Sequence, residues 1–553
     1  MSHPNGPRTG RPPFLAARGM VSSPHYLASA SGLNVLRRGG SAVDAVIAVN
    51  ATLCAVYPHM TGVGGDGFWL IAGPDTKGVQ ALHGSGAAAK AGTRDYYRER
   101  GCTDQIPMRG ALAVLTMPGA VDGWRLAHER HGRLPWADLL ADAIAYARDG
   151  VAVSRSLADW LAADAAILKQ HPRSAGIYLS EGSPQREGAR LVQADLARTL
   201  EQIANLGARA GFYEGDIARR ICDALAADGS PLRADDFAGY HAKWVEPIST
   251  SYRGHEVVQM PPSTQGLAAL QIMNLLDGFD VASWGEGTAD YYHHIVEAVK
   301  VAFADRDEWL TDPDFVKIPL ETLLSKDYAA ERRKLISSAR ALVGDDIQPG
   351  LRYGTDFDRR VPGGDTVYLC ATDADGLVVS NIQSIYHDFG SAVVAGDTGV
   401  IMQNRGCFFS LDDGHPNRLE PGKTTFHTII PALLLKDGAP VLAYGTMGGE
   451  GQPQTQTALL TRLIDFGFDV QQAIEAPRWL MGRTWGTATS SLVLESRISD
   501  ETIRELLLRG HPVTVAPRWE GTVGHAQAIR IDRVTGFFEG GADPRGDGAA
   551  MGF

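Results

Sequence analysis

The chain has 553 residues, of which 44% are hydrophobic and 21% are charged, and its formal net charge is −12. These proportions are those of an ordinary globular protein, and the length alone would predict about three or four domains. The acidic balance argues against a nucleic-acid partner, because attraction to phosphates needs a basic face. No apolar run in the sequence approaches the length of a membrane span, so we expect no membrane partner either.

The cysteines give no sign of a disulfide framework. They are odd in number and widely spaced, and no pair has the spacing of a metal or redox site: Cys54, Cys102, Cys222, Cys370 and Cys407. We therefore expect reduced thiols. Residues 1 to 18 are expected to be a disordered leader, since their first part is polar and rich in glycine and proline. This leader lacks the apolar core of a signal peptide, which predicts a cytoplasmic protein.

The first two predicted helices carry clear start signals. Ser23 is expected to cap a helix that runs to Leu36, and Ser41 a second, very apolar helix that runs to about Val56. The following segment, Gly62 to Gly67, fits the pattern G-x-G-x-x-G. It stands after a helix and before a strand-like run, however, which is the reverse of the dinucleotide-binding order, so we reject a nucleotide site there.

The middle of the chain reads mainly as scaffold. Helices are predicted over residues 135–148, 195–205, 267–276 and 291–305. The last of these contains the pair His293 and His294, which could suggest a metal site. Adjacent helix positions point to different faces, so we expect no metal here, and no cofactor anywhere in the chain.

The most informative stretch is the hairpin that follows Thr366. Two β-branched runs flank an Asp-Ala-Asp-Gly turn at residues 373–376, which is a strong hairpin signal. Thr366 stands at the start of the first strand, and a second hydroxyl returns at Ser384 on the other strand. Threonine often does no more than open a hairpin. The alternative is an N-terminal nucleophile: the chain is cut before Thr366, and the freed α-amine acts as the base for its hydroxyl.

Ordered motifs along the chain decide between these readings. They stand at residues 38–45, 61–68, 93–95, 118–124, 260–264, 302–306, 388–391, 424–431 and 447–449. Together they resemble the γ-glutamyltransferase (γ-glutamyltranspeptidase) family over nearly the whole chain. The resemblance implies an α+β fold, the αββα sandwich of N-terminal nucleophile hydrolases. It also implies a large subunit of residues 19–365, with a mobile linker from about 320 to 365, and a small subunit of residues 366–553.

The resemblance also implies roles for individual residues. Thr366 would be the nucleophile, Ser384 would hydrogen-bond it, and Gly448 and Gly449 would form the oxyanion hole, where backbone N–H groups need an approach free of side chains. Arg94 would grip the substrate carboxylate. His427 and Thr428 replace a serine pair of the typical enzyme and can still donate hydrogen bonds to an anion. His427 also fits a core histidine satisfied by the backbone.

The sequence departs from the typical family pattern where the substrate's α-amino group is held. The three acceptor positions are occupied here by Tyr386, Arg405 and Phe408. Desolvating an ammonium group without acceptors costs several kcal/mol, and an arginine nearby adds repulsion. We therefore expect a substrate with a carboxylate but no α-amine. Arg405, with residues 447–454 and 482–486, makes the chain look most like the oxamate amidohydrolase branch, and less like the cephalosporin acylase branch.

The sequence thus predicts an autoprocessing N-terminal threonine amidohydrolase that acts on a small carboxylate-bearing amide, oxamate-like or glutaryl-type. A genuine γ-glutamyltransferase remains an alternative, as does an unprocessed pseudoenzyme that only binds ligands. Water or an amino acid would resolve the acyl-enzyme. The expected partners are the small substrate and the two subunits of one precursor, and a homodimer of processed heterodimers is left open.

Overall fold

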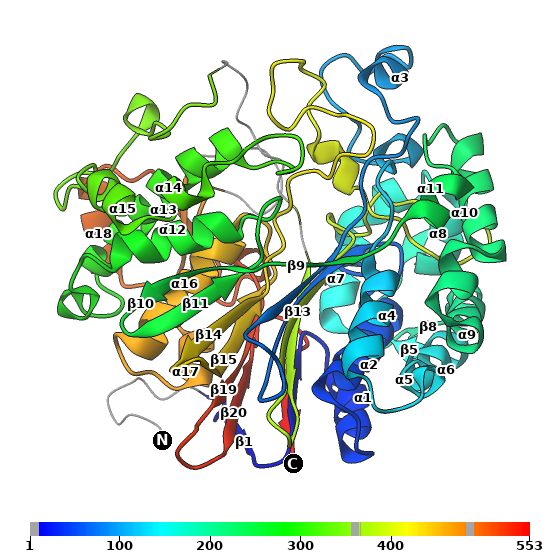
Figure 1. Ribbon diagram of the computed structural model, residues 1–553, viewed down its shortest axis with the longest axis horizontal. Helices are drawn as coiled ribbons and strands as arrows, with labels where there is room; N and C mark the ends of the chain where they lie inside the picture. Colours follow the sequence, from blue (N-terminus) through cyan, green and yellow to red (C-terminus); the bar gives the residue numbers. More distant parts are fainter. Residues whose placement is uncertain (1–9, 355–363, 365, 483–490) are drawn as a thin grey trace.

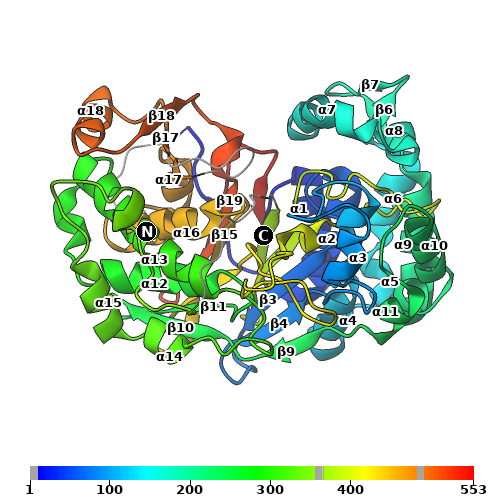
Figure 2. The same cartoon turned by 90° about the horizontal axis from the view of Figure 1, so that it is seen from above.

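In the computed structural model, two seven-stranded sheets lie face to face between two layers of helices (Figure 1). The model describes residues 10–354, 364, 366–482 and 491–553. The predicted α+β class and the αββα order of layers are confirmed. Viewed from above, one helical layer lies on each side of the central sheets (Figure 2).

The first sheet combines strands from both sides of position 366. All its neighbouring strands are antiparallel. In order of pairing they are β21 (Ala549–Gly552), β2 (Met20–Ser23), β12 (Val367–Thr372), β13 (Val378–Ser384), β3 (Asp66–Ala72), β4 (Gln80–Gly84) and β9 (Lys243–Val245). The predicted hairpin is therefore the centre of this sheet.

The second sheet is also antiparallel and also mixes the two halves of the chain. Its strands, in order of pairing, are β1 (Phe14–Ala16), β20 (Phe538–Ala542), β19 (Ala526–Ile531), β15 (Ala439–Thr446), β14 (Ala432–Lys436), β11 (His255–Gln259) and β10 (Ile248–Tyr252). Because each sheet needs strands from both predicted subunits, neither half could bury its own sheet edges alone.

Strand alternation divides the apolar side chains among three cores. In β12, Tyr368 and Cys370 point between the sheets, whereas Val367 and Leu369 point to the outer helices. The third core lies between the second sheet and its helices and includes Leu434 of β14. Each large apolar side chain fully buried in this way contributes about 1.5–3 kcal/mol, so the four-layer order follows from the strands' two apolar faces.

The helices that cover the first sheet are α1 (Tyr26–Arg37), α2 (Ala42–Val56), α4 (Ala120–His131), α6 (Ala141–Asp149) and α9 (Ala194–Ala208). The second sheet is covered by α12 (Gly266–Leu276), α13 (Ala289–Trp309), α16 (Gly451–Ile464) and α17 (Val470–Glu475). Helix α2 is predicted correctly: Ser41 caps it in a capping box, and all its residues are buried.

The remaining elements lie around this body. The helices are α3 (Arg94–Arg98), α5 (Trp136–Leu139), α7 (Arg155–Leu168), α8 (Pro172–Tyr178), α10 (Asp216–Ala227), α11 (Ala234–Gly239), α14 (Leu320–Leu323), α15 (Lys326–Arg333) and α18 (Asp500–Leu508). The small strands are β5 (Val151–Ala152) with β8 (Arg190–Leu191), β6 (Leu179–Ser180) with β7 (Ser183–Pro184), and β16 (Trp479–Met481), β17 (Leu492–Glu495) and β18 (Val513–Ala516). Within the described ranges, no helix has both the length and the apolar character that a membrane crossing requires.

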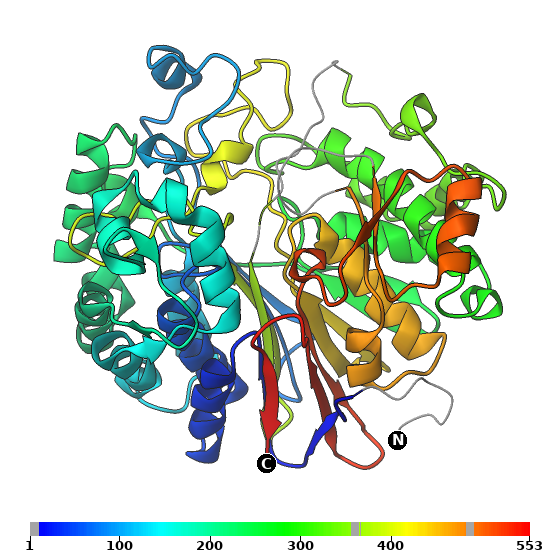
Figure 3. The same ribbon diagram turned by 180° about the vertical axis from the view of Figure 1, so that it is seen from behind.

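Two predictions near the N-terminus need correction. The helix predicted from Ser23 begins only at Tyr26 with His25 as its cap, because residues 20–23 are strand β2. The leader predicted over residues 1 to 18 is partly wrong, since Phe14–Ala16 pairs with β20; residues 1–9 lie outside the described residues. Figure 3 shows the blue β1 beside the red hairpin of β19 and β20. Local composition could not reveal a strand whose partner lies at the far end of the chain.

Candidate active site

The sheet register brings the two hydroxyl residues of the hairpin together. The ladder of β12 and β13 ends at the pair Val367 and Gln383, and Thr366 and Ser384 are the next residues along the two chain segments. On the other side of β13, Ser384 pairs with Asp66 at the start of β3. Thr366 is 1% exposed, and the Ser384 hydroxyl accepts a hydrogen bond from the backbone N–H of Tyr386 at 2.8 Å. One end of the first sheet therefore collects Thr366, Ser384 and Asp66.

The two predicted oxyanion glycines form a turn between the end of β15 and the start of α16. Their φ angles are 120° for Gly448 and 51° for Gly449, a region that residues with a Cβ rarely adopt. A Cβ on Gly449 would lie 2.3 Å from the carbonyl oxygen of Gly364. The turn is thus a glycine-only structure in contact with the segment that precedes Thr366.

Gly364 itself lies against the ring of Tyr386. A Cβ at position 364 would come within 2.0 Å of Tyr386 Cε2. Gly364 therefore lies between the Tyr386 ring and the Gly449 turn. This close fit explains why glycine stands at position 364: any side chain would displace the aromatic ring.

A strained loop follows β13. Tyr386, Phe389 and Ala392 have φ angles of 80°, 51° and 63°, and such values in bulky residues cost about 1–3 kcal/mol each. Arg109 holds this loop: its Nη1 donates to the carbonyl oxygens of Asp388 and Gly390, and its Nη2 lies 2.6 Å from the Asp388 carboxylate. Sequence analysis did not find Arg109, because nothing local distinguishes it from a surface arginine.

Arg405 has a buried guanidinium with donors to spare. It begins the short 3-10 helix η5 (Arg405–Phe408) and is 0% exposed. Its Nη1 donates a long hydrogen bond of 3.4 Å to Thr428 Oγ1, while Nε and Nη2 have no hydrogen-bond acceptor in the described structure. The guanidinium carbon lies 4.4 Å from the Tyr386 ring centroid and 5.5 Å from that of Phe408. The structure thus brings the predicted residues Tyr386, Arg405 and Thr428 together.

Asp66 and His427 lie beside this arginine. Burial raises the pKa of Asp66 to about 7, although Arg405 and the Gln403 amide both favour its charged form. Burial, followed by the charge of Arg405, holds the pKa of His427 well below its ordinary value, so this ring is neutral at pH 7. This buried group therefore places the positive charge of Arg405 beside a carboxyl group that titrates near neutrality.

A serine, a histidine and an aspartate meet here, but not as a catalytic triad. His427 Nε2 lies 2.6 Å from Ser85 Oγ, and the Asp66 carboxylate approaches the same nitrogen at 3.6 Å. In a triad the carboxylate binds the opposite ring nitrogen and sets the tautomer. The group therefore does not activate Ser85. The three side chains form a buried polar cluster. Ser85 and Asp66 are members of the candidate site that sequence analysis missed.

Arg94 is placed apart from this group. It begins helix α3, which lies at the top of the molecule in Figure 1. Its Nη1 donates to the carbonyl oxygen of Leu419 at 2.6 Å, and its Nε lies 2.6 Å from the exposed carboxylate of Asp413. The structure therefore pairs Arg94 with a buried carbonyl and an exposed carboxylate, and Arg405 is the arginine beside Thr428.

The described residues contain one group that could hold a metal ion: His293, Glu297 and His511. The Lys300 ammonium already lies 2.7 Å from Glu297 Oε1. The two histidines also face each other directly, with His293 Nδ1 2.8 Å from His511 Nε2. His294 turns away to stack on Trp284 at 4.3 Å. We read the group as a polar contact that joins α13 to the segment after α18.

With this geometry in place, comparisons with known proteins can be weighed. The family model described as gamma-glutamyltranspeptidase matches residues 28–553. The glutathione hydrolase-like YwrD proenzyme of Bacillus subtilis is 46% identical over 538 residues, which cover 97% of this chain and 99% of the relative. The oxamate amidohydrolase proenzyme of Klebsiella pneumoniae is 41% identical over 545 residues, which cover 98% and 99%.

A solved structure of a relative resembles this chain over its whole length. The crystal structure of cephalosporin acylase from Bacillus halodurans matches with a TM-score of 0.90 and 37% identity, covering 100% of this chain and 98% of that one. The names of these relatives share a hydrolase chemistry and differ in the substrate. The substrate of this chain must therefore be argued from its own pocket.

Proposed function

Because the chain belongs to the gamma-glutamyltranspeptidase family, we propose that it is an autoprocessing N-terminal threonine amidohydrolase whose substrate is a small amide with a carboxylate and no α-ammonium group. Relatives named as proenzymes support processing into subunits. The proposed cut precedes Thr366 and gives a large subunit ending at residue 365 and a small subunit of residues 366–553. Oxamate is the favoured substrate, and a glutaryl-type amide is the second choice.

The proposed chemistry uses the end of the first sheet. Thr366 Oγ attacks the amide carbonyl, and its own freed α-amine takes the hydroxyl proton, because a hydroxyl alone is a poor nucleophile at neutral pH. The N–H groups of the Gly448–Gly449 turn stabilise the tetrahedral oxyanion. The amine then protonates the leaving nitrogen, ammonia departs, and water hydrolyses the acyl-threonine. Ser384, the residue that follows the ladder partner of Val367, orients the nucleophile.

The observation that carries the substrate proposal is the spare donor capacity of Arg405. A fully buried guanidinium whose Nε and Nη2 donate to none of the described residues is costly unless an anion accepts from them. Those two donors form the planar fork that binds a carboxylate in two places. Thr428 Oγ1 lies 3.4 Å from the third nitrogen. We call Arg405 and Thr428 together the carboxylate cradle. A substrate carboxylate fits this arrangement, and a substrate ammonium beside it does not.

The position of Gly364 supports a place for the substrate. Gly364 fills the space between the Tyr386 ring and the Gly449 turn. A cut before Thr366 would release this segment, leaving a space bounded by Tyr386 and the oxyanion turn. An acyl group in that space would meet Thr366 on one side and the Tyr386–Arg405 stack on the other. We favour oxamate among such acyl groups because a carboxylate bonded directly to the scissile carbonyl needs its anchor close to Thr366.

A genuine glutathione hydrolase is the second candidate, and one observation favours it. Oδ2 of the buried Asp66 accepts no hydrogen bond from the described residues, so it could receive an ammonium group. Its raised pKa argues the other way, since a carboxyl that is half protonated near pH 7 is a weak partner for a cation.

Purified, processed protein tests the proposal with three substrates: oxamate, glutaryl-p-nitroanilide and γ-glutamyl-p-nitroanilide. We expect ammonia release from oxamate with the highest kcat/KM, and N-terminal sequencing of the small subunit that begins Thr366-Val367-Tyr368. A clear preference for the γ-glutamyl compound would overturn the pocket argument. A stable full-length chain that turns over none of the three would point to the pseudoenzyme instead.

A further inference from the structure

The buried side chain of Gln265 contacts both the carboxylate cradle and the oxyanion turn of the proposed site. Gln265 is 0% exposed and precedes helix α12. Its Nε2 donates to two carbonyl oxygens, that of Thr428 at 2.5 Å and that of Gly449 at 2.8 Å. Thr428 belongs to the carboxylate cradle and Gly449 to the oxyanion turn. Gln265 itself lies in the large subunit of the proposed processed enzyme, so this side chain ties three segments together across the subunit boundary.

The orientation of the Gln265 amide is set by its surroundings. Its backbone N–H donates to the carbonyl oxygen of His427 at 2.9 Å, which fixes the start of the side chain. At the other end, Arg306 Nη1 donates to Gln265 Oε1 at 3.1 Å. Since Arg306 can only donate and the two carbonyls can only accept, only one amide orientation satisfies all three contacts.

Arg306 is itself immobilised. It is 2% exposed, and its Nε donates to Asp307 Oδ1 at 2.6 Å. Its guanidinium carbon lies 3.7 Å from the Phe303 ring centroid. Helix α13, which carries Arg306 and Phe303, thus acts as a rigid base for the Gln265 amide. A charged donor on Oε1 also polarises the amide and strengthens the hydrogen bonds that Nε2 gives.

We propose that Gln265, held by Arg306, is a positioning residue that keeps the oxyanion turn in register with the carboxylate cradle. This inference rests on the proposed function. Two consecutive glycines have no Cβ to restrict their φ and ψ angles, so the Gly448–Gly449 turn needs an outside restraint. The hydrogen bond to the Gly449 carbonyl supplies it. Gln265 touches neither the substrate nor Thr366 in this account; it acts only through the turn.

The expected effect is on the rate and not on substrate affinity. Loss of one oxyanion donor typically lowers kcat by about 10²–10³-fold, and a donor that is displaced but present should cost less. We expect kcat of Gln265→Met to fall by about 10–100-fold. The substrate carboxylate keeps Arg405, which is fixed by the stack on Tyr386 and Phe408. KM should therefore stay within about threefold of its normal value.

The chain offers a matched control. Gln271 is a buried glutamine on α12 whose Nε2 also donates to two oxygens, Asp305 Oδ2 at 3.1 Å and the Leu323 carbonyl at 3.3 Å. Methionine replaces glutamine with little change of volume, so Gln265→Met and Gln271→Met remove comparable hydrogen bonds. Their melting temperatures should fall by similar amounts. Only Gln265→Met should lower kcat.

The experiment measures kcat and KM for both variants with the substrate that the unaltered enzyme turns over fastest, normalised to processed enzyme by intact mass. Because the substrate is chosen by assay, a failure of the oxamate proposal leaves this test intact. A kcat loss in Gln265→Met with unchanged KM, absent in Gln271→Met, supports the proposal. Equal kcat in both variants, or a loss confined to KM, overturns it.

A second variant covers the case in which Gln265→Met is not processed. Arg306→Lys leaves Gln265 in place and keeps the positive charge, but it loses the planar fork that orients the amide. We expect kcat to fall by about 3–10-fold with KM unchanged. An Arg306→Lys enzyme with normal kcat would contradict the proposal, because the amide would then be positioned without its support.

Discussion

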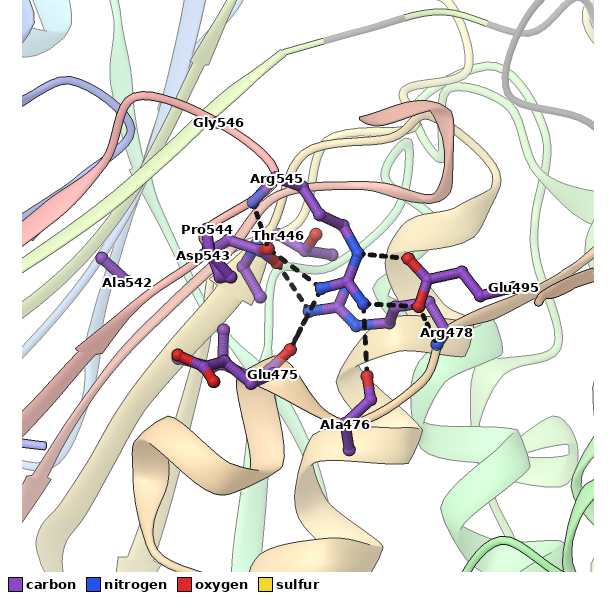
Figure 4. A network of polar contacts seen from close by, with 12 residues as sticks. Thr446, Glu475, Ala476, Arg478, Glu495, Ala542, Asp543, Pro544, Arg545 and Gly546 are labelled. Carbon is purple, nitrogen blue, oxygen red and sulfur yellow. Dashed lines mark hydrogen bonds and ion pairs between the residues drawn. The ribbon is translucent and has the colours of Figure 1, made fainter. Parts of the chain in front are cut away.

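Two buried arginines that follow residue 366 in the chain show how differently the same side chain can be used. Arg545, shown in Figure 4, donates from Nε and Nη2 to the two oxygens of Glu495 at 2.7 and 2.8 Å. Its Nη1 donates to Asp543 at 3.0 Å. Arg405 is buried as deeply, yet two of its three nitrogens have no acceptor in the described structure.

The pKa shifts of the two arginines have opposite signs, which agrees with their different partners. Burial lowers the pKa of both. At Arg545 the carboxylates of Asp543 and Glu495 outweigh burial, and the net shift is upward. At Arg405 the attraction of Asp66 does not outweigh burial, and the net shift is downward. Arg545, whose donors are satisfied by carboxylates, serves the structure, whereas the unsatisfied donors of Arg405 are the basis on which we propose it as the carboxylate-binding residue.

The largest effect should come from the nucleophile, which belongs to neither arginine site. Thr366→Ala removes the hydroxyl, so we expect no cleavage before residue 366 and turnover lower by at least about 10⁴-fold. The substitution deletes few contacts and leaves both arginines in place, and the midpoint of urea unfolding should change little. Intact mass and ammonia release measure the two outcomes. A processed, active Thr366→Ala protein would show that another residue is the nucleophile.

Arg545→Met should be the most destabilising of the arginine substitutions. It leaves Glu495 and Asp543 buried beside fewer cations, and breaking such a pair costs about 3–5 kcal/mol. Urea denaturation at pH 7 measures the loss. The fraction that remains folded and processed should keep its kcat/KM. All three nitrogens of Arg545 already donate to Glu495 or Asp543, so Arg545 has no donor to offer a substrate. A kcat/KM loss without destabilisation would reverse the roles assigned to the two arginines.

Arg405→Lys tests the fork separately from the charge. A lysine ammonium keeps the positive charge but cannot present two parallel donors to a carboxylate, and its stem lacks the planar face that stacks on Tyr386. We expect KM for oxamate to rise about tenfold, which corresponds to about 1.4 kcal/mol, with little change in thermal stability. Steady-state kinetics on the processed variant measures it. An unchanged KM would mean that charge alone suffices.

The smallest predicted effect is a pH dependence set by Asp66. Below about pH 7 this carboxyl is protonated, and the charge of Arg405 is free to attract the substrate. As the pH rises through 7, the Asp66 anion competes for Arg405, so KM for oxamate should rise by about three- to tenfold. Asp66→Asn keeps an oxygen for the Gln403 amide and cannot ionise. Its KM should be flat between pH 6 and 8; a slope equal to that of the unaltered enzyme would assign the titration elsewhere.

Much of the fold could be predicted because its signals are local. A turn sequence between β-branched runs predicts the hairpin over residues 367–384, and a cap and an apolar composition predict helix α2. Strand β1 could not be predicted, since it pairs with β20 more than 500 residues away and carries no pattern of its own. Layer order came from the family resemblance, because no local rule says which sheet faces which.

The site was predicted in part for the same reason. Tyr386, Arg405 and Thr428 were found by counting from Thr366 and by the resemblance, and the structure brings them together. Arg94 forms an ion pair with Asp413, and its expected role in binding the substrate carboxylate stays a prediction. Arg109, Asp66 and Gln265 were missed because each acts through a contact that only tertiary structure creates. The role of an arginine depends on which hydrogen-bond acceptors lie near it in the folded protein, and the sequence alone does not identify those acceptors.

The central claim is that Arg405 holds the substrate carboxylate. The most direct test compares oxamate with pyruvamide, which has the same amide and replaces the carboxylate with a neutral acetyl group. The ratio of the two kcat/KM values, measured by ammonia release, is independent of how much enzyme is folded. We predict that Arg405→Met lowers the oxamate-to-pyruvamide ratio by about 10²–10³-fold, the loss expected for one partner of a buried charge pair. A ratio equal to that of the unaltered enzyme would contradict the account.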